Sequence, residues 1–212
     1  MTEVRYNGDL TGWCGISGLG NLMEYGKSTK TLYIDGTKIE GDLVIPEGVT
    51  SISGYAFYYC SILTSITIPN SVTQIDYMAF CNSSGLTDIH YNGNLTGWLN
   101  ISGLDNLMAY VSTKTLYIDG TKIEGDLVIP EGVTSIGSYA FYNCSILTSI
   151  TIPNSVTQIG DSAFYNCSIL RSIRFQGTKT EWAAITKGSS WNYYAGDYKV
   201  YCTNGMLSRS ES

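Results

Sequence analysis

Hydrophobic and polar residues follow one short pattern that recurs along the chain. In its clearest copy the hydrophobic positions, with one proline among them, are Leu147, Ile150, Ile152, Pro153, Val156, Ile159, Ala163 and Phe164. Two hydrophobic residues separated by one polar residue predict a very short β-strand with one buried face. The proline that follows ends the strand, because it has no N–H to donate to a neighbouring strand. We therefore expect short strands, each followed by a turn in which the Ala-Phe pair fills the interior from the opposite side.

The pattern repeats at two periods. Residues 28–52 recur unchanged as residues 112–136, which is 84 positions later. Within each long module, the Ala-Phe pair recurs after 23 residues. These periods define two long modules, at residues 4–88 and 89–172, and a partial third module at residues 173–205.

A unit this short cannot bury its own hydrophobic face, but stacked copies bury it against each other. Parallel neighbours about 4.8 Å apart would then form a continuous ladder. The predicted fold is a repeat solenoid, made mainly of short parallel β-strands with short helices or turns on its convex side. We expect a single solenoid over residues 1–207 and a loose polar tail over residues 208–212.

Two kinds of insert interrupt the 23-residue repeat. A longer coil carries a recurring tryptophan, for which we expect a short helix with the indole packed inward, at Trp13, Trp98 and Trp182. Thr178 would be the N-cap of the last of these helices, with Glu181 as its capping-box partner. Asp-Gly stands between hydrophobic segments at residues 35–36 and 119–120, which predicts a β-hairpin at each place.

The motif IPxSVTxIGxxAFxxC at residues 152–167, with counterparts from Ile45, Ile68 and Ile129, resembles the BspA-like (Treponema pallidum type) leucine-rich repeat family of bacterial and protozoan surface proteins. The resemblance implies a right-handed leucine-rich-repeat solenoid. It also implies an extracellular or cell-surface location and a use in adhesion to host proteins or other cells. It supplies no catalytic residues. The chain departs from the motif at residues 81–83, where one coil lacks its usual cysteine.

Composition and charge exclude several classes of function. The chain has 12 Lys and Arg against 18 Asp and Glu, a net charge of −6, whereas a nucleic-acid binder needs a basic face. No hydrophobic run is long enough to span a membrane, and residues 1–5 lack the hydrophobic core of a signal peptide. Because the chain begins inside a module without a polar cap, we expect it to be a piece or a short relative of a longer protein.

The internal copies test each candidate catalytic or metal-binding residue. A residue that a module needs for its own chemistry should be kept when the module is duplicated. His90 is the only histidine, and the copies have Arg5 and Arg174 in its place. We therefore expect no catalytic site at His90, no enzyme activity, no metal site and no cofactor. An enzyme would need a cluster of nucleophile, base and orienting group, which the sequence does not suggest.

The six cysteines do not form a disulfide framework by the same test. Cys14 and Cys202 correspond to hydrophobic residues in the copies, so we expect both in the core. Cysteines recur after the Ala-Phe pair at Cys60, Cys144 and Cys167. Cys144 and Cys167 lie one coil apart, so a disulfide between them is left open.

One set of positions suggests a binding surface. The residue between the two hydrophobic strand positions must face outward, and stacked coils align these residues into a row. We call this set the strand-face row: Arg5, Tyr33, Val44, Thr67, His90, Tyr117, Val128, Thr151 and Arg174. The candidate ligand-binding residues within it are Tyr33, Thr67, His90, Tyr117, Thr151 and Arg174. A row of aromatic and polar side chains is typical of surfaces that bind protein or glycan, but an exposed β-ladder also favours such residues without any ligand.

The sequence thus predicts a non-catalytic binding or adhesion module whose partner is a host or cell-surface protein or a glycan. Nucleic acid and membrane insertion are not expected. The alternative is a structural spacer or stalk segment of a larger surface protein.

Overall fold

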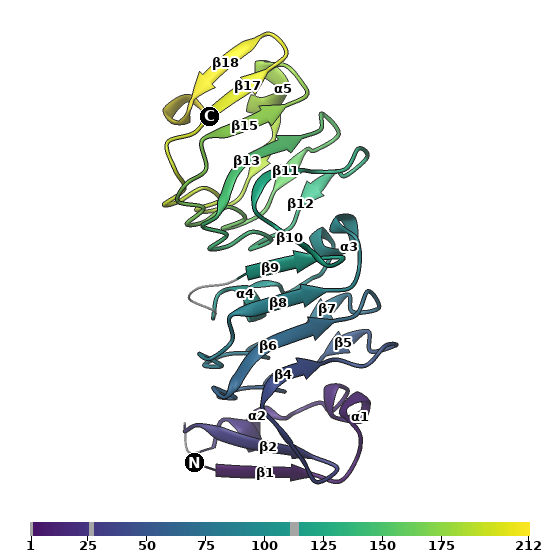
Figure 1. Ribbon diagram of the computed structural model, residues 1–212. Helices are drawn as coiled ribbons and strands as arrows, with labels where there is room; N and C mark the ends of the chain where they lie inside the picture. Colours follow the sequence, from purple (N-terminus) through teal and green to yellow (C-terminus); the bar gives the residue numbers. More distant parts are fainter. Residues whose placement is uncertain (1, 26–27, 111–114) are drawn as a thin grey trace. The chain divides into compact units, whose positions relative to one another are not determined.

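The computed structural model describes residues 2–25, 28–110 and 115–212. The chain divides into two compact units. Unit 1 comprises Met1–Gly97 and Ile101–Thr121, and unit 2 comprises Trp98–Asn100 and Lys122–Ser212. Each unit is built from stacked coils whose longer strands lie side by side on one face (Figure 1). This is the architecture of a leucine-rich-repeat solenoid, as predicted. The single solenoid over residues 1–207 stays a prediction.

Unit 1 contains two sheets of longer strands. The first sheet has the order β1 (Thr2–Tyr6), β2 (Lys30–Ile34) and β3 (Thr37–Ile39), and the second has the order β10 (Thr121–Lys122), β9 (Thr115–Ile118), β8 (Asp88–Tyr91), β6 (Leu63–Ile68) and β4 (Gly41–Val44). Strands β1 and β2 are parallel, as are β4, β6, β8 and β9. Two shorter parallel strands, β5 (Ser51–Ile52) and β7 (Gln74–Ile75), follow the prolines.

Unit 2 repeats this plan. Its longer strands have the order β11 (Gly125–Val128), β13 (Leu147–Ile152), β15 (Ser172–Phe175), β17 (Lys199–Cys202) and β18 (Gly205–Ser208). The first four are parallel and β18 is antiparallel to β17. Its short strands are β12 (Ser135–Ile136), β14 (Gln158–Ile159) and β16 (Thr186–Lys187), which are also parallel.

The ladder of longer strands is divided at the first hairpin. Strand β3 turns back and pairs antiparallel with β2, so β2 and β4 belong to different sheets. The turn residues Asp35 and Gly36 have φ of 47° and 75°, as a two-residue hairpin turn of this kind requires. The hairpin was predicted from the sequence. That it would interrupt the ladder of longer strands was not predicted. Asp119 and Gly120 adopt the same conformation between β9 and β10.

Short helices form where the tryptophan motif predicts them. They are α1 (Leu10–Cys14), α3 (Leu95–Leu99) and α5 (Lys179–Ala184), and two further short helices are α2 (Gly20–Met23) and α4 (Asp105–Met108). The three indoles are at most 1% exposed, which confirms that they pack inward. The Thr178 hydroxyl accepts from the Glu181 backbone N–H, and the Glu181 carboxylate accepts from the Thr178 N–H at 2.7 Å, so the predicted capping box is confirmed.

The capping box predicts a pH-dependent contribution to stability. The backbone N–H of Thr178, followed by its hydroxyl, lowers the pKa of Glu181 below its usual value of 4.5. The ionised carboxylate therefore stabilises the fold above about pH 4.5, and this contribution is lost as the pH falls through the lowered pKa. We expect Glu181→Gln to destabilise the protein at pH 7 and to have little effect at strongly acidic pH, measured by thermal unfolding across that range. An equal effect at both pH values would contradict this assignment.

The Ala-Phe pairs fill the interior of the coils. The rings of Phe57 and Phe80 stack at 5.2 Å in unit 1, and those of Phe141 and Phe164 stack at 5.4 Å in unit 2. All four rings are fully buried. In each turn the residue before Ala-Phe has a positive φ: Tyr55, Met78, Tyr139 and Ser162. This left-handed residue allows the chain to fold the phenylalanine back under the strands.

The position of the recurring cysteine holds a hydrogen-bond donor in both units. Cys167 donates from its thiol to the carbonyl of Phe141 at 3.2 Å. In the coil without the cysteine, Ser83 is fully buried and donates to the carbonyl of Phe57 at 2.5 Å. The departure from the motif therefore keeps the coil-to-coil hydrogen bond with a different donor.

We expect Ser83→Ala to lower the free energy of unfolding by about 1–2 kcal/mol, because the buried Phe57 carbonyl would lose its side-chain donor. Ser83→Cys should cost less, since a thiol occupies the same position in unit 2. Urea unfolding of both variants measures the difference. Unchanged stability of Ser83→Ala would show that the hydroxyl bond contributes nothing, and equal losses in both variants would show that a thiol does not replace it.

Two expectations about the C-terminal end are not met. Cys202 is only half-buried rather than part of the core, whereas its equivalents Ile34 and Ile118 are buried. Residues 208–212, expected as a loose tail, contain the 3-10 helix η1 (Arg209–Glu211). The Arg209 guanidinium donates to the carbonyls of Ala195 and Asn192 at 2.8 and 2.9 Å and so ties this segment to unit 2.

Candidate functional site

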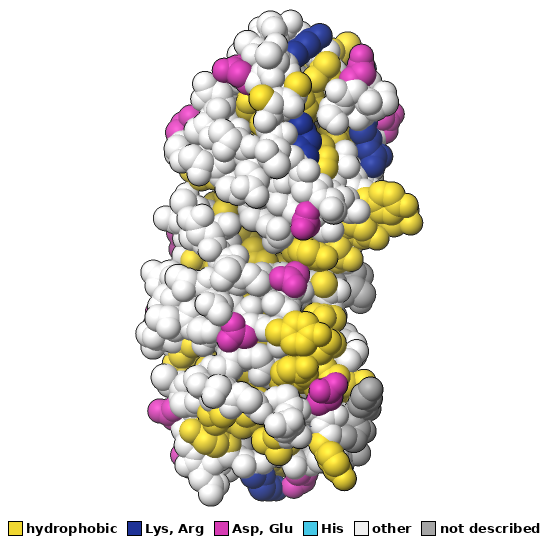
Figure 2. Space-filling view, turned by 180° about the vertical axis from the view of Figure 1, so that it is seen from behind, with side chains coloured by type: hydrophobic (Ala, Val, Ile, Leu, Met, Phe, Trp, Pro, Cys, Tyr) yellow, Lys and Arg dark blue, Asp and Glu magenta, His cyan; other side chains and the backbone are white. Residues whose placement is uncertain are grey.

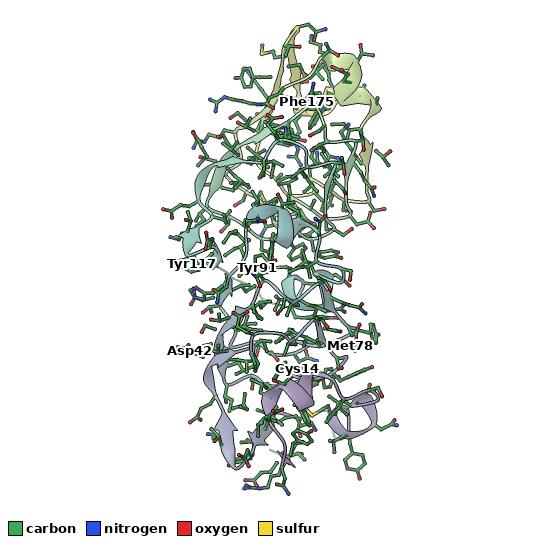
Figure 3. The ribbon with its side chains drawn as sticks, turned by 90° about the vertical axis from the view of Figure 1, so that its right-hand side faces the viewer. Cys14, Asp42, Met78, Tyr91, Tyr117 and Phe175 are labelled. Atoms are coloured by element: carbon green, nitrogen blue, oxygen red, sulfur yellow. The ribbon has the colours of Figure 1, made fainter. Side chains whose placement is uncertain are left out.

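The strand-face row is aligned by the register of the parallel strands. In unit 1, Val44 pairs with Thr67, Thr67 with His90, and His90 with Tyr117. Arg5 pairs with Tyr33 in the neighbouring sheet of the same unit. Because equivalent positions on parallel strands point to the same face of a sheet, these side chains form runs on that face. Figure 3 shows Tyr117 on the same side of unit 1 as Asp42, which precedes this row on β4.

Unit 2 carries a second run of the row. Val128 pairs with Thr151, and Thr151 with Arg174. Arg174 in turn pairs with Tyr201 on β17. Tyr201 is 45% exposed and extends the row by one residue that the sequence analysis did not include. The signal for it was present, because Tyr201 lies 84 positions after Tyr117.

Side chains within the row contact one another. The His90 and Tyr117 rings stack with centroids 4.4 Å apart and planes 6° from parallel. The Arg5 guanidinium lies over the Tyr33 ring, 4.0 Å from its centroid. Thr67, His90, Tyr117, Tyr33 and Thr151 are half-buried, and Arg174 is exposed. The contacts restrict the rotamers of the aromatic side chains before any ligand binds.

A hydrogen-bonded acid and serine flank the row in each unit. Ser65 donates to Asp42 at 2.6 Å in unit 1. Ser149 donates to Asp126 at the equivalent place in unit 2. These carboxylates are therefore partnered on the sheet rather than simply solvated, which adds hydrogen-bonding groups beside the row.

The geometry offers little for catalysis or metal binding. His90 lies between Thr67 and Tyr117, so the residues paired with it on the neighbouring strands carry neither a carboxylate nor a thiol. Among residues 2–25, 28–110 and 115–212, no group of three or more His, Cys, Asp or Glu side chains could hold a metal ion. Within the same residues, no helix has the length and hydrophobicity to cross a bilayer.

The cysteines are thiols in the structure, and Cys144 and Cys167 are not joined by a disulfide. Cys14 is fully buried, as predicted for a small hydrophobic core residue. Burial raises the pKa of the Cys14 and Cys60 thiols to about 12. Such thiols remain protonated at neutral pH and are poor nucleophiles.

Comparison with known proteins agrees with the architecture. A sequence family described as BspA type Leucine rich repeat region matches the chain in six copies, over residues 35–100 and 118–186. No curated protein matches the chain.

Several solved structures are similar to the chain. One is a leucine rich cell surface protein from Faecalibacterium prausnitzii, with 32% identity over 69% of this chain and 35% of that protein and a TM-score of 0.37. Another is a leucine-rich repeat protein from Eubacterium ventriosum, with 24% identity, coverage of 82% and 43%, and a TM-score of 0.47. The T. pallidum leucine rich repeat protein has 20% identity, coverage of 77% and 73%, and a TM-score of 0.35. The chain therefore spans less than half of the length of the first two proteins.

The family match covers more than half of the chain and includes the coils that carry Thr67, His90 and Thr151. The chain belongs to the BspA-type leucine-rich repeat family.

Proposed function

We propose that the chain is a non-catalytic interaction module that presents the strand-face row to a protein or glycan. The observation that carries this proposal is the register of the strands. It aligns Thr67, His90 and Tyr117 in unit 1 and Thr151, Arg174 and Tyr201 in unit 2. Each run combines an aromatic ring, a cationic or titratable group and a hydroxyl on one face.

The physical argument rests on preorganisation. Tyrosine provides a large contact area at low conformational-entropy cost. The stacking of Tyr117 on His90 restricts both rings before binding, so less entropy is lost when a ligand covers them. The strands that carry these six residues each have a paired strand on both sides, which keeps the spacing of the side chains constant.

The proposal places the chain at the cell surface or outside the cell, where its partner would be a host or cell-surface protein or a glycan. The BspA-type family resemblance supports this location. The spacer role remains the alternative, because a solenoid of the same construction can hold other domains apart without binding anything through this face.

The test is a binding screen against glycan arrays and extracellular-matrix proteins with the whole chain. For a partner found in this way, Tyr33→Ala/Tyr117→Ala should weaken binding by about tenfold or more, since two interfacial tyrosines are truncated. The matched control is Tyr25→Ala/Tyr193→Ala, which removes two tyrosines that are 80% and 52% exposed and lie outside the row. Equal losses in both variants would contradict the assignment of the site, and a screen without any partner would favour the spacer.

A further inference from the structure

Unit 1 has a hollow on a different face from the strand-face row. It has a volume of about 530 Å³ and lies between α2 and the turns that follow β5 and β7. The side chains that line it include Tyr55, Tyr77, Glu24, Asp76, Ser17 and Asn21. Figure 3 shows Met78, the residue after Tyr77, on the side of unit 1 opposite Asp42 and Tyr117. We call this feature the unit 1 hollow.

Close backbone approach sets the geometry of the two tyrosines. The Tyr55 N–H donates to the Tyr77 carbonyl at 3.2 Å, which joins the two turns. A side chain at Gly54 would lie 2.9 Å from the same carbonyl, and one at Gly20 would lie 3.1 Å from the Tyr55 ring. The two rings meet edge to face, with centroids 5.9 Å apart and planes at 77°. Two tyrosine rings at a steep angle to each other therefore line the hollow.

The hollow is negatively charged. Among the residues that the structure describes, its lining contains two carboxylates and no Lys, Arg or His. Among the described residues, neither Glu24 nor Asp76 belongs to an ion pair. Asp76 accepts one hydrogen bond from the Gln74 amide, at 2.5 Å. Burial and then the Glu24 carboxylate raise the pKa of Tyr55, so the field of this carboxylate reaches the aromatic wall. Figure 2, the view from behind, shows hydrophobic and acidic side chains next to one another in its lower half.

We propose that the unit 1 hollow binds the charged side chain of an arginine or lysine in a basic segment of a protein partner. A cation over the face of a tyrosine ring is attracted by the ring quadrupole, and a nearby carboxylate adds a charge-assisted hydrogen bond. The volume is within the usual range of small-ligand sites, and the hollow is open to solvent, so a side chain of a partner can enter it. A neutral sugar could donate hydroxyl hydrogen bonds to the two carboxylates, but only a cation adds a charge–charge attraction to them, which is why the charge favours a basic peptide.

Most of the lining side chains of the hollow are not repeated in the second module. Tyr55 has a counterpart in Tyr139, but Asp76 and Tyr77 are replaced by Gly160 and Asp161, and Glu24 by Ala109. The second tyrosine and both acids of the hollow therefore belong to the first module alone. This site does not depend on the proposed function, because its residues lie outside the row.

Titration calorimetry measures the binding of an acetylated and amidated penta-arginine peptide to the whole chain, in about 20 mM and about 150 mM salt. Glu24→Gln/Asp76→Asn should weaken binding about fivefold or more. Tyr77→Ala should weaken it about threefold, and Tyr77→Phe should retain it because the ring face is kept. The control Glu47→Gln/Glu131→Gln removes the same two charges at exposed, repeat-equivalent positions outside the hollow and should have a smaller effect.

Three results would overturn the proposal. The first is equal weakening by the control pair, which would show non-specific attraction to an acidic protein. The second is full retention of binding after Glu24→Gln/Asp76→Asn. The third is binding of a neutral oligosaccharide that Tyr77→Ala abolishes while penta-arginine binding is unchanged, which would assign the hollow to glycan. Circular dichroism of each variant verifies that it is folded.

Discussion

Trp13→Ala should lower the free energy of unfolding by about 4 kcal/mol. Trp13 is 1% exposed in α1, and truncation of a buried tryptophan removes a large hydrophobic area and leaves a cavity. Its indole N–H also donates to the Ala56 carbonyl of a later coil at 3.0 Å. The same bond recurs in the next module, between Trp98 and the Ala140 carbonyl at 2.9 Å. The tryptophan thus joins its helix to the next coils by both packing and hydrogen bonding.

Phenylalanine substitutions separate these two contributions. Trp13→Phe leaves the buried Ala56 carbonyl without its indole donor, and we expect a loss of about 2 kcal/mol or more. Among the described residues, the buried indole N–H of Trp182 has no hydrogen-bond partner. Trp182→Phe therefore removes an unsatisfied donor and should cost about 1 kcal/mol less than Trp13→Phe. Urea unfolding of Trp13→Ala, Trp13→Phe and Trp182→Phe measures the loss in free energy of unfolding for each and so tests this order. A Trp182→Phe loss larger than that of Trp13→Phe would contradict it.

Gly103→Ala should cost about 3 kcal/mol or more, although it adds a single methyl group. A Cβ atom at Gly103 would lie 2.0 Å from the carbonyl oxygen of Ile75 in the preceding coil, which neither backbone can accommodate without moving. The residue also has a φ of 75°, a conformation that costs alanine about 1–2 kcal/mol by itself. The two costs have separate origins, because the clash comes from the contact with Ile75 and the strain from the backbone conformation of residue 103 itself.

Gly18 provides the control, because it is the repeat equivalent of Gly103. Its φ is 77°, but a Cβ atom there would meet nothing within 4 Å. Gly18→Ala should therefore cost only the backbone strain, about 1–2 kcal/mol. The difference between the two variants in thermal or urea unfolding measures the contact between coils. Equal losses would show that α4 and β7 do not approach as closely as the structure has them.

The repeat made most of the architecture predictable. A period of 23 residues with one polar residue between hydrophobic ones defines both the strand and its buried face, and duplication at 84 positions gives each assignment a second copy. The hairpin at Asp35 and the capping box at Thr178 were predictable because each depends on a few adjacent residues. The outward orientation of Thr67, His90 and Tyr117 follows from the alternation along the strands.

The unit 1 hollow was not predictable in the same way. Tyr55 lies in an irregular turn and has a φ of 64°, and no alternation of hydrophobic and polar residues indicates where such a side chain points. The division between β2 and β4 likewise depends on which edge of β2 the hairpin strand occupies. The half-buried position of Cys202 was not predictable from the repeat either, because its equivalents Ile34 and Ile118 are buried although they too precede a hairpin strand. These features depend on local backbone geometry that the repeat does not encode.

Disulfide trapping tests the in-register stacking of coils most directly. Strand neighbours lie about 4.8 Å apart, within reach of a disulfide, whereas positions two strands apart are beyond it. Thr67→Cys/His90→Cys should therefore form a disulfide under mild oxidation, and Thr67→Cys/Tyr117→Cys should not, because β8 lies between these strands. Peptide mass spectrometry identifies the linked pairs. A disulfide in the second variant but not in the first would contradict the register on which both the fold and the strand-face row depend.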